Sequence, residues 1–261
     1  MLCSAFAKAL AADGWQTALL DINREAVEAV AQEIRQAGGQ AMAVQANVLD
    51  KEDLERAAQK VQEAWGDCDL LINGAGGNNL RGTTSSEVFS ALDLDDPEKT
   101  SFFDLDPQGV RFVFDLNFLG ALLTTQVFAK SMVKRGGNIL NISSMNAFRP
   151  LTKIPAYSAA KAAVSNFTQW LAVHFAPCGI RVNAIAPGFF VTNQNRDLLY
   201  DKDGNPTPRT EKILSQTPMG RFGEAEELLG TLRFLVDDTA SGFITGIVIP
   251  VDGGFSAYSG V

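Results

Sequence analysis

The sequence of 261 residues has little of the chemistry that binds metals or forms disulfide bonds. It contains one histidine and three cysteines, and Cys3, Cys68 and Cys178 lie far apart with no Cys-x-x-Cys pair among them. This pattern lacks both the ligand spacing of a zinc site and the paired cysteines of a disulfide framework. We therefore expect no bound metal, and we expect the reducing environment of the cytoplasm.

The single histidine also limits the possible catalytic chemistry. A Ser-His-Asp mechanism would have to use His174, which lies among apolar neighbours in the stretch Trp-Leu-Ala-Val-His-Phe-Ala. A histidine in such a helical stretch is more often a packing residue than a base.

Long apolar runs and positive charge are scarce as well. No run approaches the roughly 20 consecutive apolar residues that a membrane-spanning helix needs, and no charged segment precedes an apolar one at the start. The chain has 22 Lys and Arg against 30 Asp and Glu, which gives a net charge of -8. Because this field repels phosphate, we expect neither nucleic acid nor a membrane as a partner.

The sequence does have a regular alternation of two kinds of segment. Strand-like segments lie at 17–21, 41–47, 69–74, 138–143, 180–188 and 246–254, and helical segments lie at 5–14, 24–39, 53–66, 156–177 and 226–238. Such alternation is typical of βαβ units around a parallel sheet. With 46% hydrophobic residues, a chain of this length can bury one core. We predict a single doubly wound α/β domain over residues 1–261.

Two segments are too long for the connections of a minimal α/β unit. Residues 79–110 are rich in Ser, Thr, Asp and Pro, and residues 193–223 hold Gly204, Pro206, Pro208 and three arginines. Both are expected to be insertions at the surface. The second follows the carboxyl end of a strand, where a substrate lid would lie in an open α/β sheet.

Tyr157-Ser-Ala-Ala-Lys161 carries the strongest chemical signal. On a helix this spacing places the phenol and the ammonium one turn apart on one face. Free tyrosine titrates near pKa ~10, so proton transfer at neutral pH needs a nearby cation that favours the phenolate. Alone, the same spacing is common on solvated helix faces.

Ser144 strengthens this signal, because Ile142-Ser143-Ser144 ends an apolar strand at the edge where such sheets bind ligands. With these residues, and with Asn117 in Asn-Phe-Leu-Gly, the chain resembles the short-chain dehydrogenase/reductase family. The resemblance implies a Rossmann-like fold and assigns four roles. Tyr157 transfers the hydroxyl proton and Ser144 orients the substrate oxygen. Lys161 lowers the tyrosine pKa and holds the cofactor ribose, and Asn117 supports a proton-relay water.

Further motifs extend the resemblance over nearly the whole chain, although each could by itself be a turn or a strand end. They are Asn73-Gly74-Ala75-Gly76, Pro187-Gly188 with Thr192, and Val251-Asp252-Gly253-Gly254. The resemblance implies that a nicotinamide cofactor binds Asp21, Asn47, Val48, Asn73, Gly74, Ala75, Gly76, Tyr157, Lys161, Pro187, Gly188 and Thr192. Small residues at 74–76 would let the backbone approach the cofactor closely.

Asp21 decides which cofactor we expect, because a carboxylate at the end of the second strand position accepts both ribose hydroxyls and repels a 2′-phosphate. This favours NAD, while Arg24 nearby keeps NADP possible. A plain strand-end or helix-capping aspartate is the alternative explanation, and the two roles can coexist. Asn47 stands where the family often has aspartate beside the adenine, and its amide can still form hydrogen bonds there.

The beginning of the chain departs from the family, which opens with a strand and a glycine-rich turn. This chain starts at Met1-Leu2-Cys3-Ser4, with Cys3 in the place of the last glycine of that motif. We therefore expect a fold without the first strand and the glycine-rich loop. Two neighbouring strands would then lack ladder partners, and the cofactor pyrophosphate would lack its tight turn.

Basic residues near the expected site suggest an anionic substrate. Arg149 follows Ser144 by five residues with Lys153 close behind, and Arg196 and Arg209 lie in the expected lid. Arginine binds carboxylates through two parallel hydrogen bonds, although ordinary solvated arginines would look the same in sequence. We predict that the substrate contacts Ser144, Asn146, Arg149 and Arg196.

The two insertions and the segment Asn-Gln-Asn-Arg-Asp-Leu-Leu also resemble the sugar-acid members of the family, the D-mannonate/fructuronate oxidoreductases. This implies an NAD-linked enzyme of carbohydrate metabolism, and family membership implies a homotetramer. Three alternatives stay open at this point: a dehydrogenase of neutral sugars or polyols, a ketoacyl reductase, and a catalytically silent scaffold with the same fold.

Overall fold

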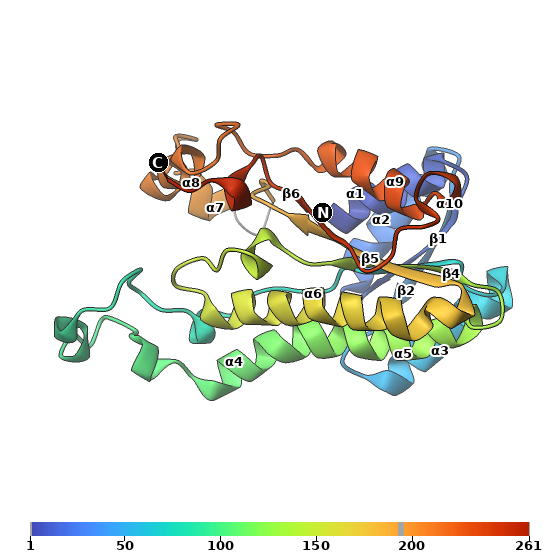
Figure 1. The fold of residues 1–261 in the computed structure, drawn as a ribbon, viewed down its shortest axis with the longest axis horizontal. Helices are drawn as coiled ribbons and strands as arrows, with labels where there is room; N and C mark the ends of the chain where they lie inside the picture. Colours follow the sequence, from blue (N-terminus) through green and yellow to red (C-terminus); the bar gives the residue numbers. More distant parts are fainter. Residues whose placement is uncertain (1, 193–195, 261) are drawn as a thin grey trace.

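The computed structural model describes residues 2–192 and 196–260, which form parallel strands with helices on both faces (Figure 1). The strands are β1 (Gln16–Asp21), β2 (Gln40–Gln45), β3 (Leu70–Asn73), β4 (Gly137–Ile142), β5 (Ile180–Pro187) and β6 (Val248–Val251). β1 and β2 form one parallel pair, and the others form a parallel sheet in the order β3-β4-β5-β6. The predicted α/β class and all the predicted strand segments are confirmed.

The helices are α1 (Leu2–Ala12), α2 (Arg24–Gln36), α3 (Lys51–Trp65), α4 (Pro107–Phe114), α5 (Gly120–Met132), α6 (Pro155–Phe175), α7 (Arg196–Leu199), α8 (Pro208–Ser215), α9 (Leu229–Val236) and α10 (Asp238–Ser241). Local chemistry sets several of their ends. The side chains of Asn23 and Asp50 accept hydrogen bonds from first-turn amides of α2 and α3. Gly38 and Gly66 follow the same helices with φ of 87° and 89°, which glycine adopts without strain.

The two sheets are not hydrogen-bonded to each other within residues 2–192 and 196–260. β1 pairs only with β2, and β3 pairs only with β4. The first described element is α1, which packs against β1, α2 and α9. The strand that would join β1 to β3 in the family pattern therefore has no counterpart in the part of the chain that the structure describes.

Alternating residues of the strands build a core on each face. Leu54 of α3 and Phe128 of α5 pack with Ile139 on one face, together with Leu171 of α6. On the other face, α1 and α9 cover Leu140, the next residue of β4. This period of two is the pattern of strands that are buried on both sides.

One long helical run was not indicated by the sequence pattern. Asp106 caps α4, so the predicted insertion 79–110 ends three to four residues earlier than expected, at the start of a continuous run Pro107–Met132. By length and a mean hydropathy of 1.4, this run could cross a membrane, but half of its most apolar window is buried. It lies beside α6 and packs as a core helix (Figure 1).

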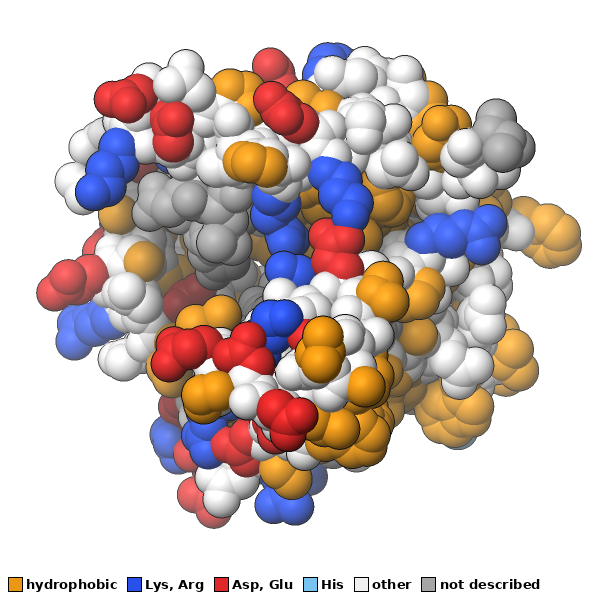
Figure 2. Space-filling view, turned by 90° about the vertical axis from the view of Figure 1, so that its left-hand side faces the viewer, with side chains coloured by type: hydrophobic (Ala, Val, Ile, Leu, Met, Phe, Trp, Pro, Cys, Tyr) orange, Lys and Arg blue, Asp and Glu red, His pale blue; other side chains and the backbone are white. Residues whose placement is uncertain are grey.

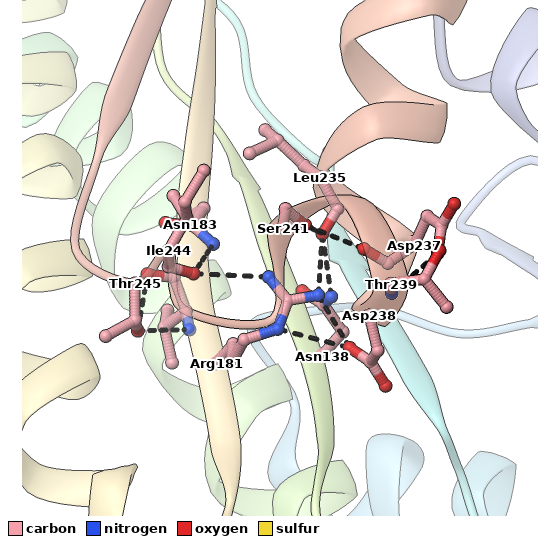
Figure 3. A network of polar contacts seen from close by, with 11 residues as sticks. Asn138, Arg181, Asn183, Leu235, Asp237, Asp238, Thr239, Ser241, Ile244 and Thr245 are labelled. Carbon is pink, nitrogen blue, oxygen red and sulfur yellow. Dashed lines mark hydrogen bonds and ion pairs between the residues drawn. The ribbon is translucent and has the colours of Figure 1, made fainter.

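A polar network ties the C-terminal part of the chain to the beginning of β5 (Figure 3). Arg181 donates to Asp238 Oδ1 at 2.8 Å, to the Leu235 carbonyl at 2.9 Å and to the Ile244 carbonyl at 3.2 Å. Asn138 of β4 also donates to the Leu235 carbonyl at 2.9 Å. These bonds hold α9 and α10 at the amino ends of the strands, away from the carboxyl ends where the predicted site residues lie.

Candidate active site

The predicted catalytic residues come together at the carboxyl ends of the central strands. Ser144 follows β4, while Tyr157 and Lys161 lie in the first two turns of α6, which packs against β4 and β5. Because parallel strands end at one edge of the sheet, this edge is where an open α/β sheet binds ligands. The structure therefore gathers residues that are 4 to 17 positions apart in the sequence at a single site.

Asn117 reaches the site through an irregular turn of its helix. Residues Asp115–Leu119 form a π-helical turn between α4 and α5, and such turns occur frequently at functional sites. The Asn117 side-chain amide donates to the carbonyls of Val113 and Gly77, both at 2.7 Å. Its Oδ1 accepts from the Gly77 amide at 3.3 Å. Asn117 thus fastens the segment after β3 to the helical run.

Tyr157 and Ser144 form the polar centre of the site. Burial raises the pKa of the Tyr157 phenol, and a hydrogen bond with the Ser144 hydroxyl opposes this increase. Ser144 Oγ also accepts from the Asn146 amide at 3.2 Å, which fixes the serine side chain. A substrate oxygen beside this pair would meet two hydroxyl groups.

Lys161 is 4% exposed, and its burial lowers the pKa of the ammonium group from 10.5 to about 8. Nζ donates to the Ile142 carbonyl at 2.9 Å and lies 5.7 Å from the centre of the Tyr157 ring. The expected lowering of the tyrosine pKa by Lys161 stays a prediction, because burial and Ser144 are the influences on Tyr157 in this structure.

Gly76 makes room for these side chains. A Cβ atom at this position would lie 2.6 Å from Asn117 Oδ1 and 3.1 Å from Lys161 Nζ. Gly74 is equally constrained, since a Cβ there would lie 2.2 Å from Cys3 Sγ. Glycine at positions 74 and 76 is therefore needed for the close packing of Cys3, Asn117 and Lys161, and the close approach of this segment to a cofactor stays a prediction. Ala75 between the two glycines is exposed.

Asn73, predicted to contact the cofactor, is buried and serves the packing around the site. Its Nδ2 donates to Thr125 Oγ1 at 2.9 Å and to Asn141 Oδ1 at 2.8 Å. Asn141 in turn donates to Thr168 Oγ1 at 2.9 Å. This chain of amides joins β3, β4, α5 and α6, and the sequence analysis missed Thr125, Asn141 and Thr168. Polar residues within apolar strand and helix segments were the available signal.

The remaining cofactor candidates lie along the same edge. Asp21 ends β1 with an exposed side chain, and its Oδ1 accepts from the Asn23 amide at 2.8 Å. Asn47 and Val48 follow β2, and Val48 packs against Gly120 of α5. Asn47 Oδ1 accepts from the Leu49 amide at 3.0 Å.

Pro187 and Gly188 end β5 against the C-terminal segment. The Gly188 amide donates to the Val251 carbonyl at 2.9 Å, and a Cβ on Gly188 would lie 2.5 Å from Asp252 Cα. The Thr192 carbonyl accepts from the Arg196 amide at 2.9 Å, which begins α7. The predicted lid 193–223 starts outside the described residues and continues through α7 and α8.

The predicted substrate residues are only partly gathered. Asn146 is 4% exposed, and its Oδ1 has no hydrogen-bond partner among the described residues, so it can accept from a ligand hydroxyl. Arg149 is instead bonded to the C-terminal segment, through Nε to the Ser256 carbonyl at 3.2 Å. Arg196 is exposed at the start of α7. In the part of the chain that is described, no group of acidic, histidine or cysteine residues could hold a metal ion.

Comparisons with known proteins agree with this arrangement. A family model described as enoyl-(acyl carrier protein) reductase matches residues 2–256. An uncharacterized oxidoreductase of Haemophilus influenzae is 61% identical over 262 aligned positions, which cover 100% of this chain and 91% of that protein. A 3-oxoacyl-(acyl-carrier-protein) reductase of Synechocystis is 34% identical over 252 positions, which cover 96% of this chain and 90% of that protein.

A solved structure is also closely similar. It is the crystal structure of a Haemophilus influenzae protein that is described provisionally as a D-mannonate oxidoreductase, with bound NAD. The two chains are 60% identical, superpose with a TM-score of 0.95, and share an alignment that covers 100% of this chain and 93% of the other.

Proposed function

Since the chain belongs to the short-chain dehydrogenase/reductase family, we propose that it interconverts a secondary alcohol and a ketone of a sugar acid, of the D-mannonate/D-fructuronate type, with NAD. The oxidoreductase class follows from the family. The observation that carries the chemistry is the pairing of Tyr157 with Ser144 beside the buried Lys161.

Each residue of this site has a separate role in proton transfer. The Tyr157 phenol donates a proton to the substrate oxygen during reduction and takes it back during oxidation. The Ser144 hydroxyl donates a hydrogen bond to the same oxygen and holds it beside the phenol. Lys161 places a cation beside the tyrosine, which favours the phenolate when the proton has left. The Asn117 amide keeps the neighbouring backbone in place through its two carbonyl bonds.

The site fits a nicotinamide dinucleotide along the edge from β1 to β5. The cradle at Gly74 and Gly76 excludes a Cβ atom, and the exposed Asp21 carboxylate at the end of β1 can accept ribose hydroxyls. The bound cofactor supplies or accepts the hydride. NAD is preferred in this proposal because the Asp21 carboxylate repels a 2′-phosphate.

Three observations support a sugar acid as the substrate. The NAD-bound structure at 60% identity belongs to a protein described as acting on D-mannonate. The buried Asn146 Oδ1 can accept from a sugar hydroxyl. Figure 2 views the end of the molecule that carries α7, α8 and residues 79–106, and basic side chains lie near the centre of this face. Their positive charge suits a carboxylate.

A ketoacyl reductase is the second candidate, because the Synechocystis relative has that name and is 34% identical. The two functions differ in the charge and polarity of the substrate next to the ketone. A sugar acid needs hydrogen-bond acceptors and a cation, whereas an acyl chain needs an apolar groove.

The test is to measure consumption of NADH and of NADPH with D-fructuronate, with D-fructose and with a 3-oxoacyl thioester. We expect D-fructuronate with NADH to give the highest kcat/KM. Faster turnover of D-fructose would favour a neutral sugar dehydrogenase, and faster turnover of the thioester would favour the ketoacyl reductase. A preference for NADPH would contradict the role of Asp21.

We also propose that the chain acts in the cytoplasm as a homotetramer. Support comes from exposed apolar side chains on the packed helices α4 and α6: Trp170 is 56% exposed and Val173 is 79% exposed on α6, and Phe112 is 44% exposed on α4. Exposed apolar side chains on adjoining helices favour association. Light scattering of the eluting protein during size-exclusion chromatography would measure the mass, and a monomer would contradict the proposal.

A further inference from the structure

Residues 79–106, here called the arm, extend from the body of the protein beside the active site (Figure 1). The arm is organised by its own hydrogen bonds. Ser85 and Thr100 are joined by two bonds of 2.8 and 2.9 Å, and Lys99 pairs with the buried Asp93 at 2.7 Å. Such a network gives a long surface segment a defined shape, which a simple connection does not need.

The arm is fastened to the loop that leads into α6. The Thr84 amide donates to the Lys153 carbonyl at 2.8 Å. Lys153 has a φ of 69° and is the only non-glycine residue with a positive φ among the described residues. A lysine held in this left-handed conformation is strained, so the surrounding contacts must determine its position. Lys153 precedes Tyr157 by four residues, and its position is therefore set at the edge of the active site.

The arm also reaches across to α8 through one acidic side chain. Glu87 forms an ion pair and hydrogen bond with Lys212, 125 residues later in the chain. Arg209 lies three residues before Lys212 on the same face of α8. Figure 2 shows basic side chains close to acidic ones in the middle of this end of the molecule.

The charges around Glu87 are those of a carboxylate site. The hydrogen bond from Lys212 lowers the pKa of the Glu87 carboxyl, and the charges of Lys212, Lys153 and Arg209 lower it further. One carboxylate is thus surrounded by three cations from two separate segments. Because Glu87 and Lys212 are both exposed, their pairing contributes little to the stability of the fold.

We propose that Lys153, Arg209 and Lys212 form the subsite that binds the carboxylate of the substrate, and that Glu87 occupies this subsite until the substrate displaces it. The inference rests on the proposed sugar-acid function and adds Glu87 and Lys212, which the sequence analysis did not name. Lys153 precedes Tyr157 by four residues, so the subsite adjoins the start of the helix that carries the catalytic tyrosine. The carboxylate of an anionic ligand can replace the Glu87 carboxylate beside the three cations. A neutral sugar has no charge with which to compete for them.

Binding of a non-reacting probe separates this inference from catalysis. Calorimetry would measure D-gluconate and, as a neutral match, D-glucitol on the wild type, Glu87→Gln and Lys212→Met, at constant ionic strength. We expect Glu87→Gln to bind D-gluconate several-fold more tightly, because the competing charge is gone. Lys212→Met should bind it about tenfold more weakly, as for the loss of one charge-assisted hydrogen bond. Binding of D-glucitol should not change in either variant.

Two matched variants control for general charge effects. Glu98→Gln removes an exposed carboxylate from the same arm, and Lys202→Met removes an exposed lysine from the turn before α8. Both should bind D-gluconate like the wild type.

The outcomes separate the two proposals. Unchanged D-gluconate binding in Glu87→Gln and Lys212→Met, or no binding in any of the proteins, would overturn the subsite. If binding responds as expected but D-fructuronate is not turned over, the subsite stands and the proposed sugar-acid function fails.

Discussion

Lys161 allows a quantitative test of the site without any substrate. The residue is buried, and its pKa is about 8 in the folded protein against 10.5 for an ordinary lysine. At neutral pH the folded protein therefore carries a desolvated ammonium group, with one hydrogen bond to the Ile142 carbonyl. We predict that Lys161→Met changes the stability of the cofactor-free protein by an amount that depends on pH.

The direction of the pH dependence follows from whether the folded or the unfolded protein holds the proton of Lys161. Between pH 8 and 10.5 the unfolded chain keeps a proton that folded Lys161 has lost, so the stability that depends on this residue rises with pH. The full difference is about 3 kcal/mol, because one pKa unit corresponds to about 1.4 kcal/mol. Roughly 1 kcal/mol of it is recovered between pH 7 and 9, and roughly 2–3 kcal/mol by pH 10. The methionine variant cannot gain this stability, so its stability relative to the wild type must fall by the same amounts.

Urea unfolding followed by tryptophan fluorescence at pH 7, 8, 9 and 10 measures this difference. Burial also raises the pKa values of Tyr157, Cys68 and Cys3, which reduces stability at high pH. Both proteins share this effect for Tyr157 and Cys68. Cys3 loses the charge of Lys161 in the variant, which raises its thiol pKa further and lowers the relative stability of the variant in the same direction. Lys60→Met, on the exposed face of α3, is the matched control and should differ from the wild type by a constant amount. A difference between Lys161→Met and the wild type that is the same at every pH would refute the burial argument.

Three further predictions concern activity and stability. Tyr157→Phe should abolish turnover while calorimetry still detects NADH binding, and an active, folded variant would disprove its role in proton transfer. Gly76→Ala should lower kcat/KM by about 100-fold, since small displacements of catalytic groups have effects of this size. Gly77→Ala, whose Cβ would make only an ordinary 3.6 Å contact with Leu116, should be tolerated. Arg181→Met should reduce the free energy of unfolding by about 1–3 kcal/mol with unchanged kcat, because buried carbonyls lose a donor. Arg135→Met, which removes exposed ion pairs, should cost less than about 1 kcal/mol, and equal losses in the two arginine variants would contradict the network.

The elements that could be predicted from sequence are those whose signal is local. The strand from Ile180 is mostly apolar because every one of its residues is buried, and glycines such as Gly38 and Gly66 mark helix ends. The run Pro107–Met132 was not recognised, because its π-helical turn shifts the apolar pattern and it follows directly on a polar insertion. Periodicity alone does not locate a helix whose register changes in the middle.

Site residues, too, could be predicted only where their signal is local in the sequence. Tyr157 and Lys161 could be predicted as site residues because they lie one helical turn apart. Ser144 could be predicted because it follows the end of a strand. The amide chain through Asn73, Asn141 and Thr168 could not be predicted, since it depends on which strands and helices are neighbours in space. Closeness in sequence to Ser144 likewise does not predict the bond of Arg149 to the Ser256 carbonyl, and the contact of Arg149 with the substrate stays a prediction.

Recognition of the substrate is harder to read than catalysis for a physical reason. Proton transfer needs atoms in hydrogen-bond contact, so its residues lie on a few rigid elements whose spacing recurs in the sequence. A carboxylate is attracted over several ångströms by any group of cations, and these can come from distant segments such as the loop before α6 and α8. Glu87 joins those segments in the structure, although 125 residues separate it from Lys212. Glu87, an acidic residue of the arm, therefore points to the basic residues that we propose bind the substrate carboxylate. A search limited to positive charges close in sequence to Ser144 would not find Lys212.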